Sequence, residues 1–422
     1  MTGGVSIPIG KNLASYEAIG VDETTYTIDG IPFKWNVKDA NLLEWTQEVL
    51  KVFEPIEFAV NDKKNEQKEQ GLPLVDSLTL AQSSCQKYLR RLAEWGKVAY
   101  TRFFEKDARD LLQELLADRP GVAAPTFRSK LTPFPWELLY EGDDDEEGDP
   151  GMFWGLHYAP ARMLGSPIIT RYESEQAPVA RMLFCLHQKL RESHQREWPH
   201  IQSLVRVCED DQLELLGASE LLAQVTDGKA LLGHLYTAQH NMIHFACHAD
   251  EADAGKDVLR MSLLKQEDLE RAVDADFSAT EIRLDTNTFA RREGLFANKP
   301  LVFLNACKTG GGGDVLREAY NLPRSFVDCQ AGAVIATACP VPDIFAAEFA
   351  RVFYGYFLRG FDMLDPQPSQ TSLGPLSIGE ALRLTRWYFI KKHNNPLGLA
   401  YGLYSPAHYR VALAPRIGSL LL

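Results

Sequence analysis

Three continuous apolar runs of strand length constrain the fold of this chain more than any other feature. They are MIHFAC (242 to 247), KPLVFLNAC (299 to 307) and AGAVIATAC (331 to 339). A fourth short run, ARMLFCLH (180 to 187), precedes them, and helix-length segments separate them. Uninterrupted apolar strands are typical of a parallel sheet that helices cover on both faces. The sequence therefore predicts a doubly wound α/β domain.

Helical patterns surround these runs. The candidates are SELLAQVTDGKALLGHLYTAQ (219 to 239), IFAAEFARVFYGYFLRG (344 to 360) and SIGEALRLTRWYFIKK (377 to 392). In open α/β sheets, functional groups gather beyond the carboxyl ends of the strands. That rule singles out His248, which closes the first apolar run, and Cys307, which closes the second.

The amino-terminal part predicts smaller elements. TTYTIDGIPFKWNV (24 to 37) alternates apolar and polar residues around Asp29-Gly30, which indicates a hairpin, and DANLLEWTQEVLKVF (39 to 53) has helical spacing. The charged stretch NDKKNEQKEQG (61 to 71) is interpreted as a linker. We expect an accessory region with a hairpin and a helix (1 to 75), a pair of helices joined near residues 100 to 103 (76 to 118) and a core domain (119 to 422).

Composition excludes several classes of protein. The net charge of −13 argues against binding to a nucleic-acid backbone, which needs a basic face. No window is apolar enough to span a membrane, and the first residues lack a signal-peptide pattern, so we expect a cytoplasmic protein with no membrane partner. The acidic stretch EGDDDEEGDP (141 to 150) is interpreted as a solvated loop, with a calcium loop as the alternative.

Two residue types at the strand ends can together perform acyl transfer. A cysteine attacks as its thiolate, and because a free thiol has a pKa of about 8.5 it needs a basic neighbour such as histidine. If the runs that end at His248 and Cys307 form adjacent strands, about 5 Å apart, the two side chains share a crevice. The backbone N–H groups of Ala249 and Cys307 are candidate donors to an oxyanion. This chemistry requires no cofactor.

Simpler interpretations of the same residues stay open. A cysteine or a histidine at the end of an apolar run is often structural, and seven scattered cysteines without C-x-x-C pairs indicate reduced thiols. The glycines of KTGGGGD (308 to 314) allow a sharp turn after Cys307, but the run lacks the Lys-Ser/Thr ending of a phosphate-binding loop. The spacing of His244 and His248 suits zinc only on a helix, since on a strand they lie about 13 Å apart. We therefore predict no metal and interpret His244 as a core or supporting residue.

The ordered motifs of the chain resemble the CHAT domain, a caspase-like family of cysteine peptidases related to separases. The motifs are H-F-A-C-H, L-V-F-L-N-A-C-x-T-G and A-G-A-V-I-A-T followed by P-V-P-D, together with PWELLYE, IGEALRLTRW and YGLYSPAHYRVAL between roughly 130 and 415. The resemblance implies a caspase-like sheet flanked by helices, with an N-terminal α+β and helical accessory region. It also implies His248 as the general base and Cys307 as the nucleophile.

The resemblance further suggests how a substrate is recognised. Asp343 occupies the last position of P-V-P-D and is a candidate for receiving a basic substrate side chain, with a helix N-cap as the alternative. Three positions depart from the family pattern: Ala249 replaces a glycine, Lys308 an acidic residue and Cys339 a tryptophan. The cation of Lys308 beside Cys307 is expected to lower the pKa of the thiol.

Two classes of function follow from the sequence. The first is a cysteine endopeptidase that cleaves a protein target through a thioester, regulated by a protein partner or signal, in bacterial defence or regulated cell death. The second is a catalytically silent, caspase-like scaffold that binds partners. The rate at which Cys307 reacts with a thiol probe separates them.

Overall fold

The structure is a computed structural model, and it forms two compact units. It describes residues 6–9, 12–15, 24–28, 31–35, 39–117, 125–129, 134–143, 148–164, 180–205, 213–215, 225, 227–237, 239–252, 256–263, 281–285, 288–289, 295–308, 321–361, 363–364 and 376–411. The first unit comprises Met1–Ile169 and Ser377–Tyr409, and the second comprises Thr170–Leu376 and Arg410–Leu422. The domain boundaries drawn from the sequence stay predictions.

The second unit contains the mostly parallel sheet that the apolar runs predict. Its strands are β7 (Met182–Leu186), β8 (Leu213–Leu215), β9 (Met242–Ala252), β10 (Lys256–Ser262), β11 (Glu281–Asp285), β12 (Leu301–Lys308) and β13 (Ala333–Thr337). They follow the order β11-β10-β9-β12-β13, and β7 pairs with both β9 and β8. The pairs of β7, β8, β9, β12 and β13 are parallel, whereas β10 pairs antiparallel with β9 and β11. The predicted α/β class is confirmed.

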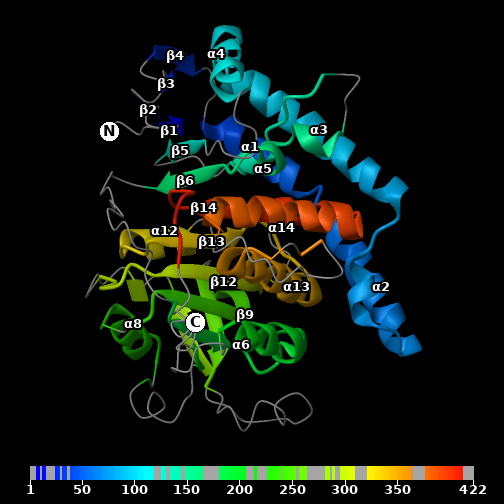
Figure 1. The fold of residues 1–422 in the computed structure, drawn as a ribbon, viewed down its shortest axis with the longest axis vertical. Coiled ribbons are helices and arrows are strands. Elements are labelled where there is room, and N and C mark those ends of the chain that lie inside the picture. The colour runs from blue at the N-terminus through cyan, green and yellow to red at the C-terminus, as the bar shows by residue number, and fades with distance from the viewer. Residues whose placement is uncertain are drawn as a thin grey trace, which may run out of the picture. The chain divides into compact units, whose positions relative to one another are not determined.

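Helices cover both faces of this sheet (Figure 1). They are α6 (Trp198–Val205), α8 (Gly228–Thr237), α12 (Asn321–Asp328) and α13 (Asp343–Tyr354), which continues as the π-helical turn Gly355–Arg359. Because successive strand residues face opposite sides, β9 and β12 serve two layers. On one face Phe303 packs on Phe353 of α13, and on the other Phe245 packs on Phe326 of α12.

The first unit is built around helices. It contains the pairs β1 (Ser6–Ile9) with β2 (Asn12–Ser15), β3 (Thr24–Ile28) with β4 (Ile31–Trp35) and β5 (Thr126–Ser129) with β6 (Ala161–Leu164), the strand β14 (Tyr401–Tyr404), and the helices α1 (Asp39–Leu50), α2 (Glu54–Gln70), α3 (Gln82–Phe103), α4 (Lys106–Ala117), α5 (Trp154–His157) and α14 (Ile378–His393). The predicted hairpin, helix 39 to 53 and helical pair are confirmed. A buried aromatic cluster in this unit includes Phe103, Trp136 and Trp154.

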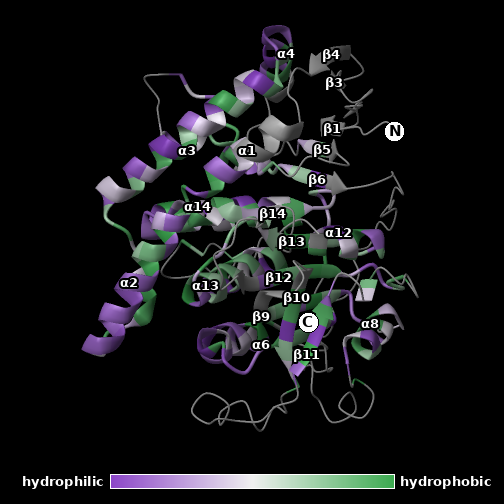
Figure 2. Ribbon diagram, turned by 180° about the vertical axis from the view of Figure 1, so that it is seen from behind, coloured by the Kyte–Doolittle hydropathy of each residue, from purple (hydrophilic) through white to green (hydrophobic). Residues whose placement is uncertain are grey.

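The charged stretch 61 to 71 is not a linker, so that prediction is wrong. It forms most of α2, which begins with Pro55 in its first turn and ends at Gly71 in the left-handed conformation at φ 67°. Ile56 and Val60, one helical turn apart, are both fully buried. The burial of these two side chains, together with the proline in the first turn and the glycine at the C-terminus, stabilises the helix although most of its other residues are polar. Figure 2 shows the resulting mixture of hydrophilic and hydrophobic residues along α2.

Some predicted features lie outside the described residues. They include the turn residues Asp29 and Gly30, the centre of the acidic loop (144–147), the glycines 310–313 and part of the predicted helix 219 to 239. None of the helices that the structure describes has both the length and the apolar character that a bilayer crossing requires.

Candidate functional site

His248 and Cys307 occupy the same register on neighbouring strands. Strands β9 and β12 pair in parallel from Met242 opposite Leu301 onward, and this ladder sets Cys307 opposite His248. Adjacent strands in a sheet lie about 4.8 Å apart. The predicted adjacency of the two strands is confirmed. The catalytic roles of the two residues, which we call the candidate dyad, stay a prediction.

The expectation that β9 ends at His248 is wrong. The strand continues to Ala252, because residues 248 to 252 pair with the antiparallel strand β10. His248 and Ala249 pair with both β12 and β10, whereas residues 250 to 252 pair with β10. The strand β12 ends at Lys308, which pairs with Ala249. Ala249 and Cys307, whose backbone N–H groups are the candidate oxyanion donors, therefore both lie in paired strands.

A charged cluster lies on the other side of His248. Arg260 of β10 is the register partner of His248, and it pairs in turn with Arg283 of β11. The Arg260 guanidinium donates to Glu281 at 2.6 Å, and Arg283 donates to the same carboxylate at 2.9 Å. These hydrogen bonds lower the pKa of Glu281 to about 2, so it stays ionised. No spacing in the sequence marks this cluster, since only the antiparallel pairing of β10 brings Arg260 beside His248.

A buried polar network lies under the candidate dyad on the same face of the sheet. His244 precedes His248 by four residues, and Asn305 precedes Cys307 by two, so all four positions share one side of the pleat. The side chains of His244 and Asn305 both contact the carboxylate of Glu197, which no solvent reaches. His244 is buried, as expected of a supporting residue. Glu197 and Asn305 were missed, because neither has a spacing that marks it.

The environment of Asp343 differs from the helix N-cap considered as its alternative. Pro342 occupies the cap position of α13, and Asp343 is the first helical residue. Its Oδ1 accepts a hydrogen bond from the Ile344 amide at 2.8 Å. A carboxylate in the first turn stabilises the helix through the macrodipole. The predicted role of Asp343 in substrate binding stays a prediction, and the neighbouring Cys339 is buried.

The described residues contain no group of three or more histidine, cysteine or acidic side chains that could hold a metal ion. His244 and His248 both lie on β9, the strand context in which their spacing does not serve one ion. Of the two histidines, His244 directs its ring nitrogens to Tyr354 and Glu197.

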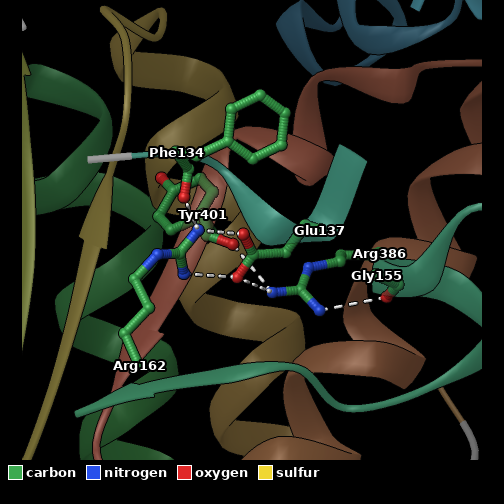
Figure 3. A network of polar contacts seen from close by, with 6 residues as sticks. All are labelled: Phe134, Glu137, Gly155, Arg162, Arg386 and Tyr401. Atoms are coloured by element: carbon green, nitrogen blue, oxygen red, sulfur yellow. Dashed lines mark hydrogen bonds and ion pairs between the residues drawn. The ribbon is translucent and has the colours of Figure 1, made fainter. Parts of the chain in front are cut away.

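A second buried network, in the first unit, joins the remaining sequence motifs (Figure 3). Glu137 of PWELLYE lies between the guanidinium groups of Arg162 and Arg386. The side chains of all three residues are only 1 to 3% exposed. Arg162 donates to Glu137 Oε1 at 2.7 Å, and Arg386 donates to the carbonyl groups of Gly155 and Tyr401 at 3.0 and 2.7 Å. Motifs up to 249 residues apart thus meet in one ion network.

Most residues of both networks lie in the part of the chain that matches a known family. A family model described as CHAT domain matches residues 124–383, which is more than half of the 422 residues. The match includes Glu137 and Arg162 of the first unit and the strands β9 and β12 of the second. No curated protein matches the chain.

Proposed function

We propose that this chain, which belongs to the CHAT domain family, is a cysteine endopeptidase with Cys307 as its nucleophile and His248 as its general base. The family is related to caspase-like cysteine peptidases. The observation that carries the proposal is the register of the two strands, in which Cys307 lies opposite His248. Strands about 4.8 Å apart allow a thiol and an imidazole in the same register to approach within the roughly 2.6 to 3.2 Å of a direct proton transfer.

The proposed reaction proceeds in two stages. His248 takes the thiol proton, and the thiolate of Cys307 attacks the carbonyl carbon of the scissile peptide bond. The backbone N–H groups of Ala249 and Cys307 stabilise the resulting oxyanion. The intermediate collapses to a thioester as the imidazolium returns the proton to the leaving amine. Water, deprotonated by His248, then attacks the thioester, releases the carboxylic acid and restores the thiol.

Asp343 is proposed to contact a basic substrate side chain before the cleaved bond. The target is proposed to be a protein, and a regulatory protein partner or signal is proposed to control the activity in a defence or cell-death setting.

An unbiased peptide-library cleavage profile tests the proposal. The wild-type chain is compared with Cys307→Ala, His248→Ala and Asp343→Asn. Cys307→Ala should abolish cleavage, and His248→Ala should lower the rate by about 10²- to 10⁴-fold, the usual contribution of a general base. Asp343→Asn should reduce the preference for a basic residue and leave other cleavages in place.

Two outcomes would count against the proposal. Cleavage that persists at the wild-type rate in Cys307→Ala would exclude this nucleophile. No cleavage by the wild-type chain, combined with a Cys307 thiol no more reactive than in the unfolded chain, would favour the scaffold function instead.

A further inference from the structure

We infer that Glu197 is a positioning residue that braces the two strands carrying the candidate dyad. This inference rests on the proposed function, because it assigns a role in the same site. Glu197 ends the π-helical turn Ser193–Glu197 and is fully buried. Inserted π-helical turns are frequently found at functional sites.

One oxygen of Glu197 contacts both dyad strands. Nε2 of His244, on β9, lies 2.6 Å from Glu197 Oε1, and the side-chain amide of Asn305, on β12, donates to the same oxygen at 2.9 Å. The other oxygen, Oε2, has no hydrogen-bond partner among the described residues. The carboxylate therefore ties one strand to the other through a single acceptor.

Helix α13 fixes the partners of Glu197 from the other side. The amide of Asn305 also donates to the Ala346 carbonyl at 2.9 Å, and the Tyr354 hydroxyl lies 2.9 Å from Nδ1 of His244. Burial, reinforced by the Glu197 charge, raises the pKa of Tyr354 well above its ordinary value, so the hydroxyl keeps its proton.

The brace acts within a short distance of the dyad. Asn305 precedes Cys307 by two residues, about 7 Å along the strand, and His244 precedes His248 by about 13 Å. Apolar packing has no preferred direction, whereas two close polar contacts to one oxygen limit how far β9 and β12 can slide against each other. A misplacement of about 1 Å in a catalytic group can cost about a hundredfold in rate.

Two substitutions of Glu197 separate its positioning role from the effect of its negative charge. In Glu197→Gln the amide oxygen replaces Oε1, still accepts the hydrogen bond from Asn305 and keeps the contact with His244, and the amide nitrogen takes the place of the unpartnered Oε2. In Glu197→Ala both Asn305 and His244 lose this contact. A positioning role therefore predicts that glutamine rescues what alanine loses.

The experiment measures the rate of Cys307 alkylation by iodoacetamide between pH 5 and 9, in the full chain, by mass spectrometry of the peptide that contains Cys307. Glu197→Ala should slow alkylation at neutral pH about tenfold or more and raise the apparent pKa of the thiol, whereas Glu197→Gln should react close to the wild-type rate. Asn305→Leu, which at similar volume removes the Asn305 contacts with Glu197 and with the Ala346 carbonyl, should also slow it. Unfolding curves of the same samples identify the folded fraction.

A matched control comes from another buried carboxylate of this unit. Glu348 is 3% exposed and pairs with Arg351 on its own helix, at 2.6 Å. Glu348→Gln should leave the alkylation rate of Cys307 unchanged.

Three results would overturn the inference or its basis. A wild-type rate in folded Glu197→Ala or folded Asn305→Leu would exclude the brace. A glutamine variant as slow as the alanine variant would assign the effect to charge and overturn the positioning role. A wild-type Cys307 no faster than in the unfolded chain would instead overturn the proposed function, which distinguishes the two failures.

Discussion

Two buried carboxylates, Glu137 in the first unit and Glu197 in the second, are both almost without solvent contact, yet they have opposite partners. Glu137 is surrounded by two guanidinium groups, so its network contains more positive than negative charge. Glu197 contacts an imidazole and an amide, and both meet one of its oxygens. A carboxylate between two guanidinium groups serves to compensate their charge, whereas we infer that Glu197 serves to position the two groups that meet its one oxygen.

The comparison separates stability from function. The Glu137 network joins residues far apart in the chain, including Arg386 of α14 and the carbonyl groups of Phe134 and Gly155. Its loss would leave buried cations uncompensated. The Glu197 network joins two strands that already pair along a ladder, so its loss should affect their fine alignment more than their folding.

The largest expected effect is therefore on the stability of the first unit. Glu137→Ala should lower the free energy of unfolding by about 3 to 5 kcal/mol, the usual cost of breaking a buried ion pair from one side. Denaturant titration checks this. Asp328→Ala, which removes a more exposed pair with Arg324, should cost no more than about 1 kcal/mol. Equal losses in the two variants would mean that the buried network contributes no more than a surface pair.

A titrating group in each unit should also make the free energy of unfolding change with pH, in opposite directions in the two units. Burial raises the pKa of Glu141, in the first unit, from 4.5 to about 7, so its contribution to stability is complete below about pH 4.5 and is lost as the pH rises through 7. Burial, with the charge of Arg351, lowers the pKa of His200, in the second unit, from 6.5 to about 4. Its contribution is present above pH 6.5 and is lost as the pH falls through 4.

Denaturant titrations between pH 4 and 8 test these slopes. Glu141→Gln should remove a loss of stability toward high pH, and His200→Gln should remove a loss toward low pH. If the free energy of unfolding changed with pH in the same way in the wild type and both variants, neither Glu141 nor His200 would cause the predicted pH dependence.

A smaller effect is expected from a pair of helical glycines. A Cβ at Gly96 of α3 would lie 2.0 Å from the Leu138 carbonyl oxygen, whereas a Cβ at Gly233 of α8 would meet nothing within 4 Å. Gly96→Ala should destabilise the first unit because the backbone at Leu138 must move. Gly233→Ala should stabilise the second unit by up to about 1 kcal/mol through helix propensity. Thermal unfolding measures both, and stabilisation by Gly96→Ala would show that the close packing at Leu138 is not required.

The sequence predicted the features that depend on short-range patterns. The apolar runs identified the central strands, and His248 and Cys307 were found because each follows such a run. The antiparallel pairing of β9 with β10 was not predictable. The extension of β9 depends on β10, and Arg260 lies beside His248 only through that antiparallel pair. The helix α2 was mistaken for a linker because two buried residues, Ile56 and Val60, outweigh a mostly polar sequence.

The networks around both carboxylates also depend on tertiary structure. Asn305 was part of a quoted motif, but only the fold shows that its amide meets Glu197, which lies 108 residues earlier. Glu137 and Arg386 belong to motifs that marked the family, and their contact was not visible in either one. A rule on sequence spacing detects partners within one helix or strand, whereas the partners in each of these networks come from several different elements.

The pH dependence of Cys307 alkylation, compared between the wild-type chain and His248→Ala, tests the proposed dyad most directly because it needs no substrate. A functional pair predicts fast alkylation of the folded wild type well below pH 8, where a free thiol of pKa about 8.5 is mostly protonated. It also predicts that His248→Ala returns the profile to that of a free thiol. A wild-type profile that already follows the free thiol, and does not change in His248→Ala, would contradict the account.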